Sequence, residues 1–181
     1  MIGVRKIAYA CYVMPDPQQQ AEYYTDILGL TLVEKDSDAI YLANTVDHHS
    51  VVLRKGAEAK CVRIGFQVGP DDDLAAFERQ TAAQGVKTET KRDAGPTVDE
   101  MVSFEDPKGT VMEVFKPPEP LKSKFQRKGI VPHKLGHVAF HVTDAKAVTK
   151  FYCDVLGFRV SDWMAISSRS SAAVSITTLS I

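Results

Sequence analysis

A repeated stretch constrains the fold of this 181-residue chain more than any other feature of its sequence. Residues 5–16 (RKIAYACYVMPD) align without a gap with residues 133–144 (HKLGHVAFHVTD), at an offset of 128 positions. At the same offset, residues 23–30 (YYTDILGL) fall on residues 151–158 (FYCDVLGF), and the two segments share an Asp, a Leu and a Gly. A weaker copy, VRIGFQV at 62–68, precedes a further helical pattern. Such long-period self-similarity predicts repeated structural units.

Residues 134–162 indicate what one unit contains. An apolar run of β-forming residues at 135–142 predicts a strand that is buried on both faces. Thr143 and Asp144 are suited to cap the helix that follows, in which apolar residues recur at three- and four-residue spacing. Gly157 stands where a helix C-terminal glycine belongs, and Phe158 then begins another predicted strand that continues through Trp163.

The order of predicted elements places two complete units before residue 118. Each unit has one helix (17–28 and 71–84) and four strands (4–14, 30–35, 39–43 and 50–54, then 61–68, 86–90, 100–105 and 110–116). Two such units bury enough apolar surface for a stable domain, whereas one would be marginal. We therefore predict an α+β fold of paired βαβββ modules. It has a complete domain at 1–118, a linker rich in proline and lysine at 119–132, and the first part of a second domain at 133–164.

Composition narrows the classes of function. A net charge of −1 gives no electrostatic case for binding nucleic acid or an anionic membrane, and no apolar stretch is long enough to cross a bilayer. Met1 leads straight into a predicted strand rather than into a signal peptide. The three cysteines are odd in number and lie in apolar elements, which predicts free thiols in a reducing cytoplasm.

Several motifs together resemble a known family. GHVAFHVTD followed by FYCDVLGF, the doubled units and DPKGTVME at 106–113 resemble the vicinal oxygen chelate superfamily, which includes glyoxalase I, bleomycin-resistance proteins, fosfomycin-resistance enzymes and extradiol dioxygenases. The two-domain layout is most similar to the type I extradiol ring-cleaving dioxygenases of catechol-type aromatics. In that branch the first domain is structural, and the second binds Fe(II) through two histidines and a glutamate. The resemblance implies Fe(II), a small aromatic diol and O₂ for a full-length form, and leaves a homo-oligomer open.

His137 matches the first metal ligand of that pattern. His133 and His141 share its parity along the strand, but four residues of strand span about 13 Å, whereas a metal–nitrogen bond is about 2 Å. Only one of the three can therefore bind a given ion. The resemblance places the other metal ligands, the acid/base histidine and a substrate-binding tyrosine beyond this chain. We therefore expect no catalytic residue here, no ring-cleaving activity and no stable retention of iron.

The first domain carries candidate residues at the matching positions. Tyr9 stands where His137 stands, Arg63 lies in the central copy, and Glu113 occupies the superfamily's carboxylate-ligand position. Arginine does not deprotonate to bind metal, so we interpret Glu113 as structural or solvent-facing. The segment 48–50 (HHS) falls where an active domain carries His-His-Thr, and we expect a polar entry to a strand there. Two alternatives remain: a metal-free binding module similar to bleomycin-resistance proteins, and a glyoxalase-type enzyme, against which Tyr9 and Arg63 argue.

The last residues depart from the family pattern. Residues 165–181 (AISSRSSAAVSITTLSI) have one charge and no aromatic residue, where the pattern calls for an aromatic strand leading to His-His-Thr. If the gene is read one base earlier, position 165 must become Gly, and serines with TCN codons become large apolar residues. One permitted back-translation of this shifted frame contains the sequence His-His-His-Thr. We therefore interpret this tail as aberrant and frameshifted. It would leave the strand at 135–142 with an exposed edge and an uncovered apolar face, unless that strand docks on the first domain.

Overall fold

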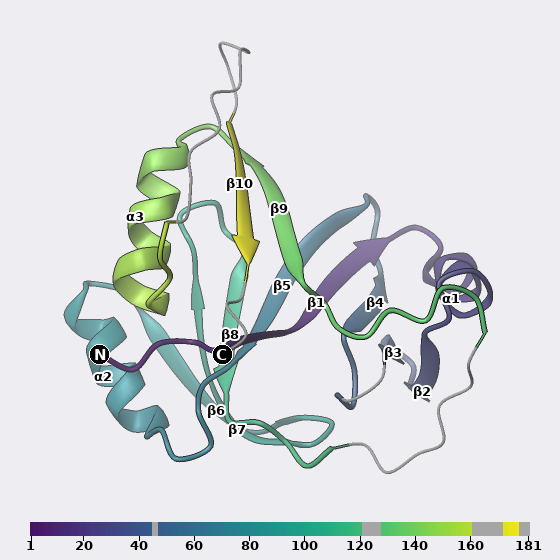
Figure 1. Ribbon diagram of the computed structural model, residues 1–181, viewed down its shortest axis with the longest axis horizontal. Helices are drawn as coiled ribbons and strands as arrows, with labels where there is room; N and C mark the ends of the chain where they lie inside the picture. Colours follow the sequence, from purple (N-terminus) through teal and green to yellow (C-terminus); the bar gives the residue numbers. More distant parts are fainter. Residues whose placement is uncertain (45–46, 121–127, 161–171, 178–181) are drawn as a thin grey trace.

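The computed structural model describes residues 1–44, 47–120 and 128–160, together with the backbone of 172–177. Eight strands form one sheet in the order β2-β3-β4-β1-β5-β8-β7-β6 (Figure 1), and this sheet with its two helices is called the first domain below. The first module consists of β1 (Lys6–Met14), α1 (Pro17–Asp26), β2 (Thr31–Lys35), β3 (Ala39–Ala43) and β4 (Val51–Lys55). The second consists of β5 (Lys60–Gln67), α2 (Leu74–Ala83), β6 (Thr88–Gly95), β7 (Val98–Glu105) and β8 (Val111–Phe115).

Strand pairing confirms the prediction of paired βαβββ modules. In each module the first strand pairs in parallel with the last strand, as β1 with β4 and β5 with β8. The two modules join where β1 and β5 pair antiparallel, with Ala10 opposite Ile64. Helices α1 and α2 lie at opposite ends of the sheet in Figure 1, as the two separate modules require. The fold is therefore of the α+β class, with one sheet that contains both parallel and antiparallel pairs.

Capping side chains decide where the helices begin. Asp16 accepts a hydrogen bond from the backbone N–H of Gln19, and Pro17 opens α1. The predicted helix 71–84 begins later, at Leu74, because two aspartates before it bind backbone N–H groups instead of continuing the helix. Asp73 caps α2 by accepting from the N–H of Ala75, while Asp72 accepts from the N–H of Gly69.

The next elements in the chain are β9 (His137–Val142) and α3 (Ala145–Leu156). Asp144 caps α3, and Gly157 ends it with a φ of 75°, in the left-handed region that favours glycine. The predicted strand after Gly157 is absent at residues 158–160, and its continuation to Trp163 lies outside the described residues. Phe158 instead completes the helix C-cap, since its N–H donates to the carbonyl of Tyr152 and its ring contacts Phe66.

Strand β9 is buried on one face only, which corrects the prediction of burial on both faces. Val138 and Val142 are buried, whereas His137, Ala139 and His141 are exposed. The prediction that β9 has an exposed edge is also wrong for one of its two edges, because β10 (Ala172–Thr177) pairs antiparallel with β9. The β10 sequence AAVSIT includes β-branched residues that favour a strand. The rest of the predicted aberrant tail, 165–171 and 178–181, lies outside the described residues.

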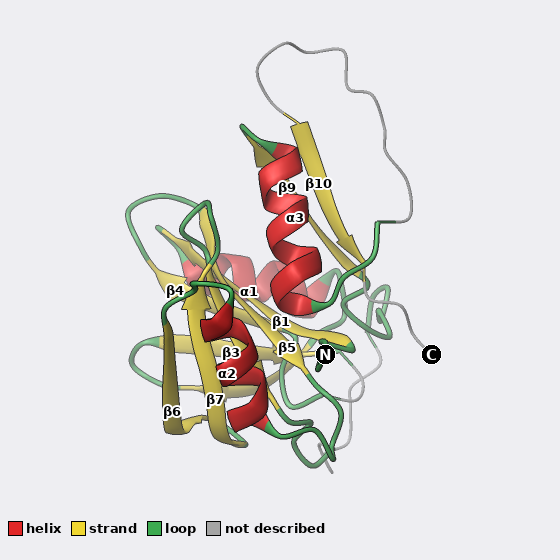
Figure 2. Ribbon diagram, turned by 90° about the vertical axis from the view of Figure 1, so that its left-hand side faces the viewer, coloured by secondary structure: helices red, strands yellow, loops and turns green. Residues whose placement is uncertain are grey.

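Helix α3 docks on the first domain, as one of the two expectations for this segment required. Figure 2 shows α3 and the β9–β10 pair as a layer above the first domain. Four apolar residues of α3 (Val148, Tyr152, Val155 and Leu156) belong to the same core as Phe66, Phe77 and Phe104 of the first domain. The N–H of Val4 also donates to the carbonyl of Leu156, at 2.9 Å. β9 and α3 are therefore stabilised by the core that the preceding modules form. Among the described helices, none is long and apolar enough to cross a bilayer.

Candidate functional site

Three adjacent strands bring a tyrosine and a glutamate together at the centre of the first domain. Tyr9 on β1 lies opposite Gly65 on β5, which in turn lies opposite Glu113 on β8. A Cβ atom on residue 65 would lie 2.3 Å from Cε1 of the Tyr9 ring. Because glycine has no Cβ, the ring passes over residue 65, and the Tyr9 hydroxyl donates a hydrogen bond to Oε2 of Glu113.

Arg63 supplies the second partner of this glutamate. Its Nη1 atom donates to Oε1 of Glu113 at 2.9 Å, and the glutamate side chain is only 3% exposed while that of Arg63 is 40% exposed. Both carboxylate oxygens of Glu113 are therefore engaged. Burial, and then the neighbouring Glu113, raise the pKa of Tyr9 well above its ordinary value, so the phenol stays protonated as a donor. Of the two expectations for Glu113, the buried structural role is the observed one.

These side chains do not fit a metal ion. Tyr9 is protonated, Arg63 has no free lone pair, and Glu113 already accepts from both. Over residues 1–44, 47–120 and 128–160, no group of three or more His, Cys, Asp or Glu side chains could hold a metal. Tyr9 is aligned with His137 in the internal repeat. At this position the first module therefore has a tyrosine in a hydrogen-bonded network, whereas a metal ligand is predicted at the equivalent position, His137.

His48 and His49 lie just before β4, where we expected a polar strand entry, but both are buried. Their Nδ1 atoms are 3.1 Å apart, and the ring of His49 packs between Tyr9 and Tyr41 at centroid distances of 4.8 and 5.2 Å. Burial, and then the neighbouring His48, lower the pKa of His49 to about 3. His49 is therefore neutral near pH 7 and packs against the ring of Tyr9.

The predicted ligand His137 stands on the exposed face of β9, as does His141 on the same strand, and His133, which precedes the strand, is exposed as well. The described residues bring no pair of further donors to His137 that would complete a set of three. The three cysteines are free, with Cys11 buried and the other two half-buried, as the sequence predicted. Burial raises the pKa of Cys11 and of Cys61 to about 11, so both thiols are protonated near pH 7.

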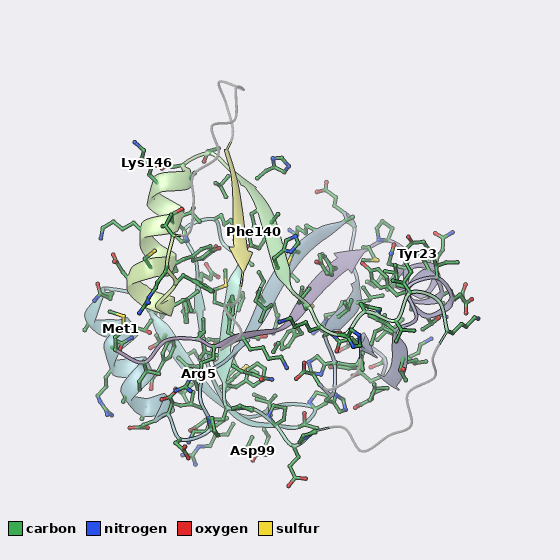
Figure 3. The ribbon with its side chains drawn as sticks, in the orientation of Figure 1. Met1, Arg5, Tyr23, Asp99, Phe140 and Lys146 are labelled. Atoms are coloured by element: carbon green, nitrogen blue, oxygen red, sulfur yellow. The ribbon has the colours of Figure 1, made fainter. Side chains whose placement is uncertain are left out.

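The turn between β7 and β8 attaches β9 and α3 to the first domain. Asp106 is buried in this turn and accepts a hydrogen bond from the hydroxyl of Tyr152 on α3, at 2.6 Å. Lys108 pairs with Asp106, and its Nζ lies 3.8 Å from the ring centroid of Phe140. Figure 3 labels Phe140 on β9. This attachment cluster, made of Asp106, Lys108, Phe140 and Tyr152, fixes the strand that carries His137 against the first domain.

Comparison with known families agrees with this architecture. The family model of the Glyoxalase/Bleomycin resistance protein/Dioxygenase superfamily matches residues 6–114 and 134–172. The chain belongs to this superfamily. The first matched range spans both modules described above except the last residue of β8, and the second contains β9 and α3.

Individual members of the superfamily match most of the chain. A manganese-dependent 2,3-dihydroxybiphenyl 1,2-dioxygenase of Geobacillus genomosp. 3 is 24% identical over 91% of this chain and 57% of its own length. An iron-dependent extradiol dioxygenase of Rhodococcus jostii (strain RHA1) is 29% identical over 90% of this chain and 57% of its own. The structure of a Mn(II)-bound glyoxalase from Novosphingobium aromaticivorans superimposes with a TM-score of 0.80 at 30% identity, covering 91% of this chain and 56% of that one. The chain thus spans little more than half the length of these relatives.

Sequence reasoning found the superfamily positions Tyr9, Arg63 and Glu113, but it did not predict that they contact one another. The signal available was Gly65, a glycine in the middle of a β-rich run, which indicates close approach of a neighbouring group. The attachment cluster was missed as well. The superfamily motif DPKG contributes Asp106 and Lys108 to it, whereas Phe140 and Tyr152 were identified only as apolar residues of a strand and a helix.

Proposed function

We propose that this chain supplies the first domain and the opening elements of the second domain of an extradiol ring-cleaving dioxygenase for catechol-type aromatics. We further propose that the 181 residues alone do not cleave a ring. The observation that carries the second statement is the donor set, because His137 is exposed on β9 without two further ligands among the described residues. The names of the Geobacillus and Rhodococcus relatives support the first statement.

The proposed metal of the full-length form is Fe(II), with His137 as one ligand. An extradiol centre uses two imidazoles and one carboxylate, and its affinity comes from the complete set and its geometry. The residues described in this chain do not fit such a centre, so we assign no ring-cleaving step to them. Their proposed role is to fix β9 through Asp106, Lys108 and Tyr152. Because manganese also serves one named relative, reconstitution with Mn(II) belongs in the same test.

The proposed domain limits are 1–118 and 133–164, joined by a linker at 119–132. The proposed aberrant tail is 165–181, and its composition supports that assignment, since it has no aromatic residue and Arg169 as its single charge. Sequencing the gene across the codons for Met164–Ser168 tests the frameshift. The frameshift, whether it lies in the gene or in its sequencing, is supported if the frame one base earlier encodes an aromatic strand and a His-His-Thr segment, and it is overturned if that frame encodes neither. The free thiols support a cytoplasmic location.

Oxygen uptake tests the proposed activity. The 181-residue chain, supplied with Fe(II) and catechol, is expected to consume no more O₂ than its His137→Ala variant, while the frame-corrected protein consumes O₂ and forms a yellow ring-fission product. In the corrected protein, His137→Ala should abolish uptake, whereas His141→Ala, on the same exposed face of β9, should retain it. Catechol-dependent uptake by the 181-residue chain that disappears in His137→Ala would contradict the proposal.

A second candidate is a glyoxalase-type activity, favoured by the 30% identity and TM-score of 0.80 to the Novosphingobium structure. The frame-corrected protein separates the two candidates when it is assayed with catechol and O₂ and, in parallel, with methylglyoxal and glutathione. Turnover of methylglyoxal without uptake of O₂ would favour the glyoxalase-type activity.

A further inference from the structure

We propose that the first domain binds a small aromatic carboxylate in a basic groove that requires no metal. The groove has a volume of about 390 Å³, within the range of pockets that hold small ligands. It lies between the ends of β1 and β4, the start of β5 and the turn that leads into β8. Four basic side chains line it, namely Arg54, Lys60, Arg63 and Lys108. The described residues that line it include no carboxylate.

Arg63 is the best-placed anion ligand in this basic groove. One of its N–H groups is engaged by Glu113, and a guanidinium has five, so four donors remain. The buried Glu113 fixes the guanidinium at one end while 40% of the side chain stays exposed toward solvent. A guanidinium held in this way loses little conformational freedom on binding and matches a carboxylate with two parallel hydrogen bonds. Arg63 is therefore a preorganised group for binding a carboxylate in this groove.

The other cations of the groove are only partly neutralised. Arg54 lies 3.9 Å from Asp38, and both side chains are well exposed, so this pair is weak. Lys60 is exposed at the start of β5. Lys108 is paired with Asp106 and belongs to the attachment cluster, so it contributes mainly to the local field. Three of the four cations have a carboxylate partner and Lys60 adds a further charge, so a net positive charge remains at the groove and favours an anion over a neutral ligand.

The apolar part of the lining indicates why the anion should be organic. Val13, Val62 and Val111 line the groove beside the cations. A flat apolar ring can cover these side chains while its carboxylate reaches Arg63, whereas inorganic phosphate would leave them in water. This juxtaposition of a fixed guanidinium and an apolar wall selects an aromatic carboxylate.

Calorimetric titration of the 181-residue chain with benzoate tests the proposal without any metal. We expect saturable binding of benzoate and at least about tenfold weaker binding of the neutral isostere benzamide, because a hydrogen bond to a charged partner is lost. Inorganic phosphate should compete poorly. The double variant Arg54→Gln/Lys60→Gln removes two exposed cations and should weaken benzoate binding about tenfold or more. The matched control Arg79→Gln/Lys91→Gln, on α2 and β6 outside the groove, should bind as the unaltered chain does.

Arg63→Lys keeps a cation beside Glu113 but removes the planar fork, so it should weaken benzoate binding while the thermal unfolding midpoint stays close to that of the unaltered chain. Any one of three results would overturn the proposal: no saturable binding of benzoate, equal binding of benzamide, or equal loss of binding in the control variant. Tighter binding of phosphate than of benzoate would reassign the groove to inorganic anions and overturn the aromatic class. None of these results bears on ring cleavage, because no metal is present.

Discussion

At residue 65 the absence of a Cβ atom decides how the centre of the first domain is built. The ring of Tyr9 crosses that position to reach Glu113, and the three residues belong to neighbouring strands. A side chain at position 65 would either displace the ring or separate the strands. The buried carboxylate of Glu113 would then lose one of its two partners, which is costly in a desolvated site.

Gly65→Ala should therefore lower the free energy of unfolding by about 2–4 kcal/mol, combining overpacking with loss of the tyrosine hydrogen bond. Urea denaturation measures this change. Gly136→Ala is the matched control, because a Cβ there meets nothing within 4 Å, and its effect should stay within about 0.5 kcal/mol. Equal stability of Gly65→Ala and the unaltered chain would show that the ring of Tyr9 does not depend on this glycine.

His49 predicts how stability responds to acid. Its pKa in the folded state is about 3, below the ordinary histidine value of about 6.5, so the unfolded chain binds more protons between these values. Stability contributed by neutral His49 is fully present above about pH 6.5 and falls as the pH is lowered toward 3. Between pH 6.5 and 5, before most carboxylates titrate, the loss should reach about 1.6 kcal/mol.

In His49→Gln this acid-dependent loss should shrink, because glutamine does not titrate, whereas His141→Gln, at an exposed position of β9, should leave it in place. Urea denaturation at pH 6.5 and at pH 5 gives both values. A His49→Gln variant that loses as much stability as the unaltered chain over this interval would contradict the assignment.

At the scale of elements, α3 is tied to the first domain by apolar burial and by the hydroxyl of Tyr152 on Asp106. Tyr152→Phe keeps the ring but removes a hydrogen bond to a carboxylate, which should cost about 1.5–3 kcal/mol. Hydrogen exchange should become faster in α3 and remain unchanged in β3 and β4. Tyr23→Phe is the control, since that ring on α1 is half exposed. Unchanged exchange in α3 would mean that Asp106 does not hold the helix.

The sequence predicts an element well when local patterns determine it, and poorly when contacts between residues distant in the sequence determine it. The helices and most strands follow local patterns, such as Asp144 before α3 and Gly157 after it, so they were predicted close to their bounds. The strand expected to begin at Phe158 failed because that ring packs back on Phe66, a contact far away in sequence. The β9–β10 pairing was not predicted either, because a tail rich in Ser, Ala and Thr lacks the alternation of apolar and polar residues by which a strand is recognised.

For the whole molecule, the internal repeat predicted the architecture because symmetry-related positions must build similar modules. It could not predict what occupies the equivalent positions. Tyr9 replaces the ligand-position histidine, and the contact of Tyr9 and Arg63 with Glu113 depends on strand register. From the sequence, Glu113 could be interpreted as a structural or as a solvent-facing residue, and only its burial and its two partners separate the two interpretations. Superfamily membership was visible in the motifs, whereas the docking of α3 on the first domain was one of two alternatives.

Metal stoichiometry of the 181-residue chain tests the proposed donor set most directly. The purified chain is incubated anaerobically with Fe(II) or Mn(II), desalted, and analysed by inductively coupled plasma mass spectrometry beside its His137→Ala and Glu113→Gln variants. The prediction is far less than one ion per chain, with the same value in both variants, because one exposed imidazole and a fully engaged Glu113 do not make a metal site. A value near one ion per chain that falls in either variant would contradict it.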